Sequence, residues 1–342
     1  MPDVKALRKT HGMVTAKDVA DSAGVSLTTV SRCFGEAANL VSKKTRERVM
    51  SVASQLGYSP NIAARLLASR KSNLIGLLVN NFDDPEHLDL FRFVSAEAQK
   101  QKYHAILLNI SKDRRDSESI DMALQYQVDG LLVAASHLTD EMAKRCAAQN
   151  KPIVIVGRKS NRPEYSSVYC NNEDGAAQVA AYFHSKGVSR PAFIGGSPTA
   201  TVTKERMAGF VRKTEELYGF QPITRMAGTN DFDKGRIVAR ELLEMPKPPD
   251  GFFCSSDLLA VGVKDAIAEF SGGSLGPEPP VVGFGQSMLS RLSAYQLLSV
   301  GLPFETMVRA ATSHLVDMIS GEISEPTEIV FSCKLLDQEN SV

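Results

Sequence analysis

The amino-acid sequence predicts an N-terminal all-α domain followed by an α/β core of two Rossmann-like, parallel-sheet subdomains. Residues 15–56 contain three stretches with apolar residues at helical spacing, and a glycine separates the first two. After residue 72, short runs of leucine and β-branched residues alternate with amphipathic stretches, which is typical of parallel sheets covered by helices. A chain of 342 residues is long enough for this arrangement.

The net charge of zero hides an asymmetry along the chain. Residues 1–71 contain 12 Lys or Arg against 5 Asp or Glu, a balance of +7, so the remainder carries −7. The basic N-terminal part is therefore the part that we expect to meet phosphate groups.

The five cysteines are scattered without the C-x-x-C spacing of metal or redox sites, which indicates reduced thiols. No basic start followed by an apolar run resembles an export signal, and no segment approaches the ~20 apolar residues of a membrane span. We therefore expect a soluble, cytoplasmic protein that does not contact membranes.

The first predicted element is a helix-turn-helix over residues 15–34. Val19, Ala20 and Ala23 form one apolar face of its first helix, and Gly24 supplies the sharp turn. A generic helical hairpin would show the same pattern. The element does not stand alone, however, because a third helix follows it.

The second helix of this element is capped by Ser26, and its Val30 and Phe34 point inward. The residues left on its outer face are hydroxyl-bearing, apolar or basic: Leu27, Thr28, Thr29, Ser31 and Arg32. Such side chains can reach base edges and phosphates in a major groove of DNA.

The third helix is capped by Ser42, runs from Lys43 to Leu56 and is stopped by Gly57. Its apolar stripe consists of Val49, Val52, Ala53 and Leu56. Three helices in about 45 residues form a bundle suited to one groove. We assign residues 1–59 to this DNA-binding domain.

The core is expected to contain two series of alternating strands and helices. The first has strands at Leu74–Val79, Ala105–Asn109, Gly130–Val133, Ile153–Val156 and Val168–Cys170, and helices at Pro85–Lys102 and before Gln127 and Gln149. The second has helices at 174–186, 203–218, 232–244 and 257–270, and strands at 191–195, 223–227, 251–254 and 280–284. A final strand is expected near Glu328–Leu336.

Residues 60–73 form the predicted boundary between the domains. Pro60 and Asn61 open a helical patch over Ile62–Ser69 that is too short to be stable alone in water. We assign 60–73 to a hinge helix and linker. The core then spans 74–342, with an N-subdomain of about 74–170 and 303–342 and a C-subdomain of about 171–302.

Several segments together resemble the LacI/GalR family of transcriptional regulators, over essentially the whole chain. In the N-terminal part they are Val-Ala-x-x-Ala-Gly-Val-Ser-x-x-Thr-Val-Ser-Arg, Gly-Tyr-x-Pro-Asn and Ala-Arg-x-Leu. In the core they are Leu-Ile-Gly at 74–76, Val-Asp-Gly at 128–130, Pro152–Val156, Asn172-x-x-Gly175, Glu205-Arg206-x-x-Gly209-Phe210, Ser256-Asp257 and Val282-Gly283-Phe284. Each core motif alone is weak.

The resemblance implies a sequence-specific repressor that binds a pseudo-palindromic operator as a homodimer. It implies a periplasmic-binding-protein-like core that holds a small-molecule effector, such as a sugar or sugar acid, in a cleft between its subdomains. The DNA-binding residues that it implies are Thr15, Ser26, Leu27, Thr28, Thr29, Ser31, Arg32, Ser42, Thr45, Tyr58, Asn61, Ala64, Leu67 and Ala68.

Leu27 and Thr28 lie at the pair of positions that selects the operator in this family. Arg32 can pair with guanine or with a phosphate, and the sequence leaves both open. By the same resemblance, Leu67 is the apolar wedge of a hinge helix that enters the minor groove, with Ala64 and Ala68 allowing close approach. The alternative for Leu67 is packing within the helix.

The effector residues implied by the resemblance are Asn80, Phe82, Arg158, Arg206, Phe232, Ser256 and Asp257. Arg206 is the strongest candidate, because a guanidinium can grip a carboxylate, a phosphate or vicinal hydroxyls. Its alternative role is an internal salt bridge. Phe232 is expected to stack on a sugar face or simply to pack in the core.

Two positions depart from the family pattern. Gly285 follows Val-Gly-Phe, where many sugar-binding relatives carry aspartate, and Gly157 follows Val156, where some relatives carry it. Because the two arginines remain while these carboxylates are missing, we hypothesise that the cleft favours an anionic ligand.

The sequence offers no candidate for catalysis, cofactor binding or metal binding. Gly283-Phe284-Gly285 lacks the third glycine of a dinucleotide site, since position 288 is methionine, and Gly195-Gly196 lacks the lysine of a phosphate loop. The six histidines show no metal-ligand spacing. We therefore expect a non-enzymatic protein without cofactors.

Two other classes stay open. One is a DNA-binding protein whose core has lost its effector, and the other is a solute-binding protein, which would need an export signal and no DNA reader. The chain shows no leucine heptads after its last expected strand, which favours a dimer over a tetramer. Whether the effector releases or promotes DNA binding is not determined by the sequence.

Overall fold

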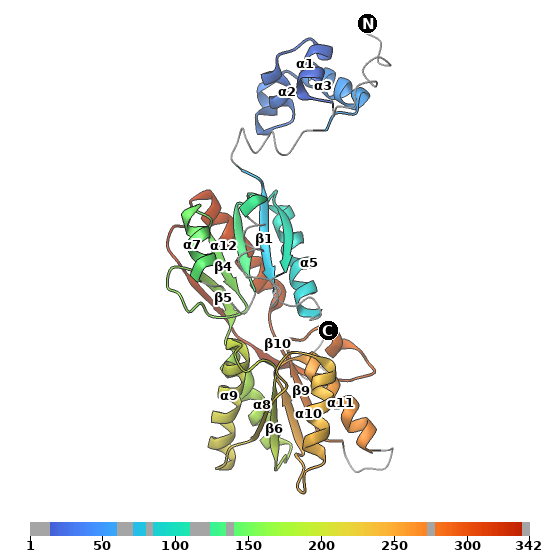
Figure 1. The fold of residues 1–342 in the computed structure, drawn as a ribbon, viewed down its shortest axis with the longest axis vertical. Helices are drawn as coiled ribbons and strands as arrows, with labels where there is room; N and C mark the ends of the chain where they lie inside the picture. The colour runs from blue at the N-terminus through green and yellow to red at the C-terminus, as the bar shows by residue number, and fades with distance from the viewer. Residues whose placement is uncertain are drawn as a thin grey trace. The chain divides into compact units, whose positions relative to one another are not determined.

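The computed structural model describes residues 14–59, 71–79, 85–109, 124–134, 140–271 and 278–336 (Figure 1). The chain divides into two compact units, Met1–Ser72 and Asn73–Val342. The expected hinge helix, with Asn61, Ala64, Leu67 and Ala68, lies outside the described residues, as do Asn80 and Phe82.

Within residues 14–59 the N-terminal unit consists of α1 (Ala16–Ala23), α2 (Leu27–Cys33), the short 3-10 helix η2 (Glu36–Leu40) and α3 (Lys43–Leu56). Gly24 ends α1 in the left-handed conformation, with a φ of 61°, and so turns the chain into α2. The unit has a core of its own, built around the fully buried Val19, Val30 and Val49. The predicted helix-turn-helix and third helix are thereby confirmed.

Phe34 lies just outside α2 rather than within it, as the residue that caps the C-terminal end of that helix. Its ring contacts the ring of Tyr58 edge-on, at 5.5 Å between centroids. Phe34 therefore points into the core of the helical unit, as expected, and its partner Tyr58 belongs to the segment after α3.

In the described residues the core contains two six-stranded sheets, with the strand orders β11-β5-β4-β3-β1-β2 and β12-β10-β9-β8-β6-β7. The first sheet is formed by β1 (Leu74–Val79), β2 (His104–Asn109), β3 (Gly130–Val133), β4 (Ile153–Val156), β5 (Ser166–Cys170) and β11 (Glu328–Phe331). The second is formed by β6 (Pro191–Gly195), β7 (Ile223–Met226), β8 (Gly251–Cys254), β9 (Val281–Phe284), β10 (Leu298–Gly301) and β12 (Lys334–Leu336). All pairings are parallel except that of β12 with β10.

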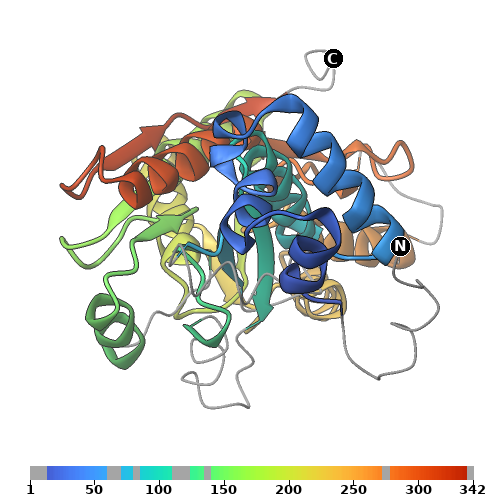
Figure 2. The same ribbon diagram turned by 90° about the horizontal axis from the view of Figure 1, so that it is seen from above.

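Helices cover both faces of the first sheet. The helices α5 (Pro85–Lys100) and α12 (Phe304–Ser320) contact each other and pack on one face, while α7 (Asp140–Ala148) lies on the other side (Figure 2). Successive side chains of β1 point to opposite faces of the sheet. Leu77 faces the side covered by α5 and α12, and Leu78 faces the side that carries Cys146 of α7.

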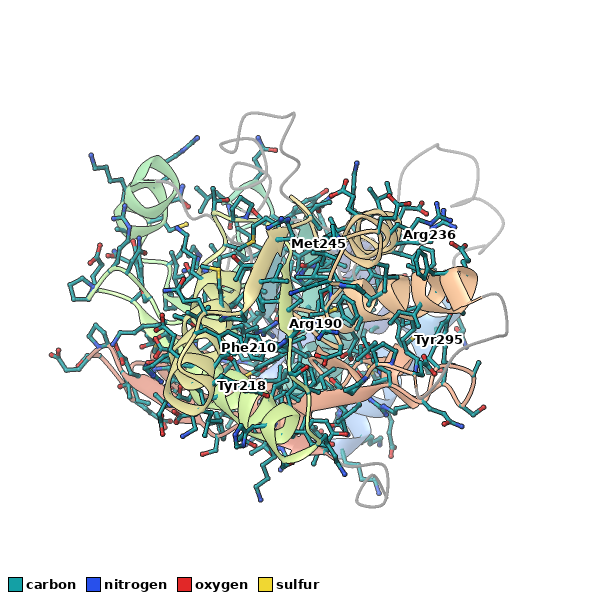
Figure 3. All side chains as sticks on the ribbon, turned by 90° about the horizontal axis from the view of Figure 1, so that it is seen from below. Arg190, Phe210, Tyr218, Arg236, Met245 and Tyr295 are labelled. Carbon is teal, nitrogen blue, oxygen red and sulfur yellow. The ribbon has the colours of Figure 1, made fainter. Side chains whose placement is uncertain are left out.

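The second sheet is covered in the same way by α8 (Asn172–Ser185) and α9 (Thr201–Tyr218) on one face and by α10 (Phe232–Leu243) and α11 (Asp257–Ser271) on the other. On β6, Phe193 packs with Phe210 of α9, whereas Ile194 packs with the side chains of α10 and α11. Figure 3 shows Phe210 and Tyr218 on the α9 side of this lobe and Arg236 on the α10 side. Continuous apolar strands of this kind are typical of parallel sheets buried on both faces.

The described chain crosses between the two sheets at three places: between β5 and α8, between β10 and α12, and between β11 and β12. The last crossing differs from the expected division, which placed all of 303–342 in the first subdomain. Residues 334–336 instead extend the second sheet, because β12 finds an open edge there and pairs antiparallel with β10.

The sequence also failed to indicate β10 and α12, and it merged β11 and β12 into one strand. Smaller differences lie at element ends, where α5 stops at Lys100 and β2 begins at His104. Among the described residues, no helix combines the length and the apolar character needed to span a membrane.

Candidate functional site

The outer face of α2 presents the side chains expected to read DNA. Leu27 is 53% exposed, and Thr28, Ser31 and Arg32 are exposed beside it, while Val30 and Cys33 are buried on the opposite face. Because one face of α2 is buried and the other is exposed, α2 can lie in a groove of DNA with these four exposed side chains directed towards the DNA.

Thr29 differs from its neighbours because it is only half-exposed. Its backbone N–H donates to the Ser26 hydroxyl at 3.1 Å, and the two hydroxyls lie 2.9 Å apart. Ser26 and Thr29 therefore fix the start of α2, as an N-cap does, in addition to any contact with DNA.

The remaining described DNA-binding candidates gather at helix starts. Thr15 caps α1, where its hydroxyl donates to Asp18 at 2.7 Å, and Ser42 caps α3 by accepting from the N–H of Thr45 at 3.3 Å. The pKa of Asp18 is lowered by its hydrogen bonds to Thr15. Helix N-termini carry partial positive charge and free N–H groups, which suits contact with phosphates.

Tyr58 is half-buried beside Phe34, and burial raises the pKa of its phenol. Its ring is therefore part of the core of the helical unit. Sequence reasoning did not single out the exposed Lys43, Lys44 and Arg46 at the start of α3, although the positive balance of residues 1–71 was the signal that could have found them.

In the core, a group of charged and polar side chains lies where the two sheets meet. We call it the junction cluster, and it consists of Glu86, Arg158, Asn172, Glu205, Arg206 and Asp257. Glu86 and Arg158 belong to the first lobe, and the other four belong to helices of the second lobe.

Arg206 lies at the centre of the junction cluster and is only 6% exposed. Its Nε donates to Oδ1 of Asn172 at 2.9 Å, and its Nη1 donates to the backbone oxygen of Ser255 at 2.6 Å. Its guanidinium also stacks on the ring of Phe284, at 3.8 Å from the centroid. Within the described ranges the third nitrogen, Nη2, has no hydrogen-bond partner.

Burial lowers the pKa of Arg206, and the carboxylate that most opposes this effect is that of Glu86, in the other lobe. Asn172 connects Arg206 to the neighbouring Glu205, because its Nδ2 donates to Oε2 of Glu205 at 2.8 Å. The alternative role expected for Arg206 was an internal salt bridge. In the structure, the amide of Asn172 lies between Arg206 and Glu205 and hydrogen-bonds to both.

Arg158 is also buried, at 8% exposed. Burial lowers its pKa, and the nearby carboxylate of Glu205 opposes this effect. Burial in turn raises the pKa of Glu205, against the hydrogen bond from Asn172 and the charges of both arginines. Arg158 and Glu205 thus form an attractive pair of charges that spans the two lobes.

Asp257 is 2% exposed at the first position of α11. Its Oδ1 accepts from the Ser299 hydroxyl at 2.6 Å, and its Oδ2 accepts from the Ser287 N–H at 2.6 Å. Burial raises its pKa in spite of these bonds. Asp257 therefore ties the start of α11 to β10 and to the segment after β9.

The two other expected effector residues have structural contacts as well. Ser256 accepts from the N–H of Leu259 at 3.4 Å and so caps α11. Phe232 is half-buried at the start of α10, where it packs against the apolar core of α10 and α11 and lies 6.0 Å from the guanidinium of Arg236.

Gly157 and Gly285, the two expected departures from the family pattern, each have a backbone conformation that favours glycine. The φ of Gly157 is 82° and that of Gly285 is 125°. A side chain at either position would be strained. A Cβ at Gly285 would also come within 3.3 Å of Oε2 of Glu86 and 4.0 Å of Oδ2 of Asp257. The two departures are therefore built into the local backbone.

Sequence reasoning missed Glu86, Asn172, Ser255 and Phe284 as partners of Arg206. Asn172 and Phe284 belong to the family motifs Asn172-x-x-Gly175 and Val282-Gly283-Phe284, and this membership was a signal that could have found them. Glu86 gave none, because only tertiary structure brings the start of α5 close to Gly285.

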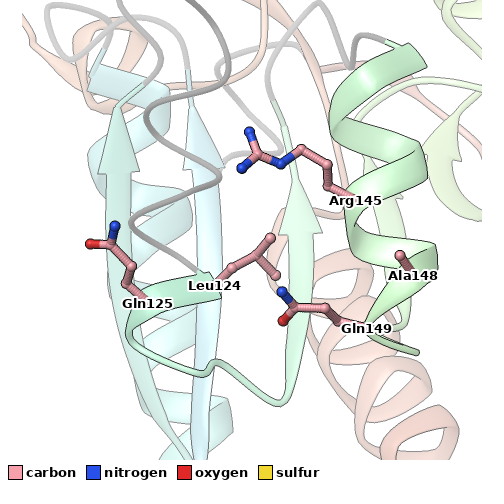
Figure 4. Close-up of a pocket in the computed structure, with 5 residues that line it drawn as sticks. All are labelled: Leu124, Gln125, Arg145, Ala148 and Gln149. Carbon is pink, nitrogen blue, oxygen red and sulfur yellow. The ribbon is translucent and has the colours of Figure 1, made fainter.

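Two cavities in the described part of the molecule are lined by none of the junction-cluster residues. One, of about 350 Å³, is lined by Leu124, Gln125, Arg145, Ala148 and Gln149 beside α7 (Figure 4). The other, of about 360 Å³, lies beside β12 and the segment between β9 and β10. Neither contains an expected effector residue.

Comparison with known proteins identifies the class of both units. Residues 15–61 match the family described as bacterial regulatory proteins, lacI family, and residues 180–339 match a periplasmic binding protein-like domain. The transcriptional regulator CelR of Thermobifida fusca is 30% identical over 336 residues, which cover 95% of this chain and 98% of CelR. The probable transcriptional repressor ExuR of Bacillus subtilis is 26% identical and covers 96% of this chain and 98% of its own.

Solved structures agree with this result. A lac repressor structure with bound ONPG superposes with a TM-score of 0.83 at 24% identity, covering 96% of this chain and all of that one. A CelR–cellobiose complex gives a TM-score of 0.70 at 27% identity, with 96% of this chain and 100% of that chain covered.

The fold and these relatives define a DNA-binding transcriptional regulator, not an enzyme. The chain belongs to the LacI family of bacterial regulatory proteins. The fold class expected from its sequence, a helix-turn-helix domain joined to a periplasmic-binding-protein-like core, is confirmed.

Proposed function

We propose that this protein is a cytoplasmic repressor that binds a pseudo-palindromic operator as a homodimer and changes its affinity when a small molecule binds between the lobes of its core. The observation that carries this proposal is the exposed face of α2, with Leu27, Thr28, Ser31 and Arg32 outward and an intact core behind it. The relatives ExuR, CytR and PurR are named as repressors.

In this proposal, some residues at α2 contact the phosphate backbone and others contact the bases. Ser26 and Thr29 hold the helix start near a phosphate, whereas Leu27, Thr28 and Arg32 face the base edges. Thr15, Ser42, Thr45 and Tyr58 support the same contact from the other helices. Asn61, Ala64, Leu67 and Ala68 are proposed to act in the minor groove from the hinge segment.

The effector site is proposed at the junction cluster. Arg206 offers its Nη2, Arg158 and Glu205 attract each other across the lobes, and Ser256 and Asp257 begin α11 beside them. A ligand inserted here changes interactions of both lobes at once, so it can couple to operator binding. Asn80, Phe82 and Phe232 complete the proposed set. The relative in a CelR–cellobiose complex and the lac repressor with bound ONPG support a ligand-binding core.

The experiment is operator selection from random DNA with the full chain, followed by titration of the selected duplex. We expect a symmetric site with a complex of two chains per duplex by sedimentation. Enrichment of no sequence over random DNA, or one chain per site, would contradict the proposal. A metabolite panel added to the complex then tests for a coupling free energy of about 1–3 kcal/mol. A complex that no metabolite alters favours a core without an effector.

A further inference from the structure

Two cysteines that are far apart in the sequence meet at the crossings between the two sheets. Cys170 is the last residue of β5, at the first crossing, and Cys333 lies between β11 and β12, in the third crossing. We propose that this pair is a redox-modification site, at which a peroxide joins the two sulfur atoms in a disulfide bond. The bond ties two of the three crossings together.

The two thiols are neighbours because β11 pairs with β5. The register places Phe331 beside Cys170, and Cys333 follows two residues later. The Sγ of Cys333 donates to the backbone oxygen of Asn171 at 3.4 Å, and the thiol of Cys170 donates a hydrogen bond to Cys333. Thiols in such contact need only small side-chain rotations and shifts to reach the geometry of a disulfide.

A third sulfur atom lies beside the pair. The Sγ of Cys170 is 4.0 Å from Sδ of Met307, in the first turn of α12, which follows the second crossing. The three sulfur atoms thus come one from each crossing, and all three side chains are buried in one core cluster. Each of the other cysteines lies in a different core cluster: Cys33, Cys146 and Cys254. Cys170 and Cys333 are therefore the two cysteines that the fold brings together.

The surroundings of Cys333 favour its reactive thiolate form. The hydrogen bond from Cys170 lowers the pKa of Cys333, and the charge of Arg206 acts in the same direction against burial. The same hydrogen bond, together with burial, raises the pKa of Cys170. Cys333 is therefore the nucleophile, and Cys170 keeps its proton. The guanidinium of Arg206 also opposes a soft metal cation, which three sulfur atoms could otherwise bind.

The reaction with hydrogen peroxide takes place in two steps. The Cys333 thiolate attacks one peroxide oxygen, the O–O bond breaks, and a sulfenic acid forms while the released hydroxide takes up the proton that Cys333 had lost. The sulfur of Cys170 then attacks the sulfenic sulfur, the S–O bond breaks, and the second hydroxide leaves with the Cys170 proton. Two thiols are oxidised to one disulfide, and one peroxide is reduced to two waters. Because hydrogen peroxide is little larger than water, it suits side chains that are only 3% exposed.

The disulfide restrains the segments through which the two lobes are joined. Hinge motions between lobes are absorbed by a few residues of the connecting segments, and Asn171 and Cys333 belong to these segments. Asn172, the next residue along the first crossing, accepts from Arg206 in the junction cluster. Oxidation therefore holds the lobes in one arrangement and makes operator binding insensitive to an effector. This regulatory role rests on the proposed function, whereas disulfide formation does not.

The first experiment counts thiols in the full-length protein. The reduced protein is treated with hydrogen peroxide, denatured and titrated with a thiol reagent. We expect the count to fall by two, from five to three, and to return to five after dithiothreitol. Peptide mapping should assign the disulfide to Cys170 and Cys333. A count that stays at five, a disulfide between other cysteines, or a loss that dithiothreitol does not reverse would overturn the proposal.

The second experiment compares Cys170→Ser with Cys254→Ser, a control that removes a fully buried thiol from another core cluster. After peroxide, Cys170→Ser should hold Cys333 as a sulfenic acid that dimedone traps, whereas Cys254→Ser should still form the disulfide. Dimedone labelling of Cys333 that is no greater in Cys170→Ser than in Cys254→Ser would contradict the order of the two steps.

Hydrogen exchange measures the restraint in wild type, and so does not depend on the folding of a variant. The backbone amides of Asn171 and Leu335 donate to Phe331 and Gln178, one at each side of the pair. Their exchange should slow about tenfold on oxidation and recover on reduction. Equal exchange in both states would refute the restraint. Operator binding by the reduced protein, measured in parallel, reports on the proposed function separately.

Discussion

The guanidinium of Arg206 lies 3.8 Å from the ring centroid of Phe284, so a cation from α9 rests on the end of β9. The same guanidinium donates to Asn172 and to the backbone of Ser255. One side chain thereby connects the start of α8, the end of β9 and the segment after β8. Arg206 is thus a structural residue of the second lobe as well as a proposed effector residue.

Replacing Arg206 by lysine should destabilise the core. A lysine ammonium cannot reproduce the planar fork, so either Asn172 or the Ser255 oxygen loses its buried partner, at a cost of about 1–3 kcal/mol. Denaturant unfolding of Arg206→Lys measures this loss. Arg212→Lys on the same helix is the control, because Arg212 forms an exposed ion pair with Glu173 and its replacement should change stability by less than about 0.5 kcal/mol. Equal stability of the two variants would show that the buried fork contributes nothing.

Arg32→Ala should weaken operator binding by about 1–3 kcal/mol if its side chain reads a guanine edge. The loss would then be confined to the operator and absent from scrambled duplexes. If Arg32 contacts only phosphate, affinity falls alike for both and the salt dependence becomes shallower. Fluorescence anisotropy on both duplexes at several salt concentrations distinguishes these results. Unchanged affinity for every duplex would remove Arg32 from the interface.

The free energy of unfolding should fall below neutral pH because of His314 in α12. This side chain is buried, its Nε2 lies 2.8 Å from the Ser166 hydroxyl, and burial lowers its pKa against the charge of Asp317. The unfolded chain takes up the proton at a pH near ~6.5, before the folded chain does. The contribution of neutral, buried His314 to the free energy of unfolding is therefore fully present above that pH. It is lost as the pH falls through the lowered pKa of His314 in the folded state.

His314→Gln should reduce this pH dependence, because glutamine does not titrate. Chemical unfolding between pH 7.5 and pH 5, at about half-unit steps, gives the slope to compare. The exposed His104, replaced by glutamine in the same way, serves as the control. A slope that is the same in His314→Gln as in wild type would contradict the assignment.

Gly209→Ala should destabilise the second lobe through a backbone clash. A Cβ at Gly209 would lie 2.1 Å from the backbone oxygen of Glu173, where α9 crosses α8. The helices would have to separate, at a cost of about 1–3 kcal/mol or more, and Arg206 would move with α9. Ala208→Ser, at the exposed neighbouring position, should cost less than about 0.7 kcal/mol. A melting temperature for Gly209→Ala equal to that of Ala208→Ser would refute the close approach.

Much of the fold could be predicted because local patterns determine it. Gly24 and Ser26 mark the turn and cap of the DNA-reading element, and the apolar runs of β1 and β6 identify buried parallel strands. By contrast, β10 has the sequence Leu-Ser-Val-Gly, whose serine and terminal glycine break the continuous apolar run that marks four-residue strands such as β4. The strand β12 is shorter still and takes its place by pairing with β10.

The junction cluster shows the limit of sequence reasoning more clearly. Arg158, Arg206 and Asp257 could be chosen by family motif, but their charge balance could not. It depends on Glu86 and Glu205, which reach the arginines only after two lobes have formed and met. Side-chain types in a motif therefore indicate which residues gather at the junction better than they indicate the electrostatic character of the junction.

The three crossings between the sheets have a consequence for biosynthesis. Tyr169 on β5 donates to Glu328 on β11, a partner 159 residues later in the chain. During translation, the β5 edge of the first sheet therefore stays unpaired until the whole second lobe and then β11 have been synthesised. During that interval β5 is exposed to pairing with other nascent chains. Fragments that stop before residue 328 should accumulate in inclusion bodies, whereas a circular permutant with β11 placed before β5 should fold more rapidly.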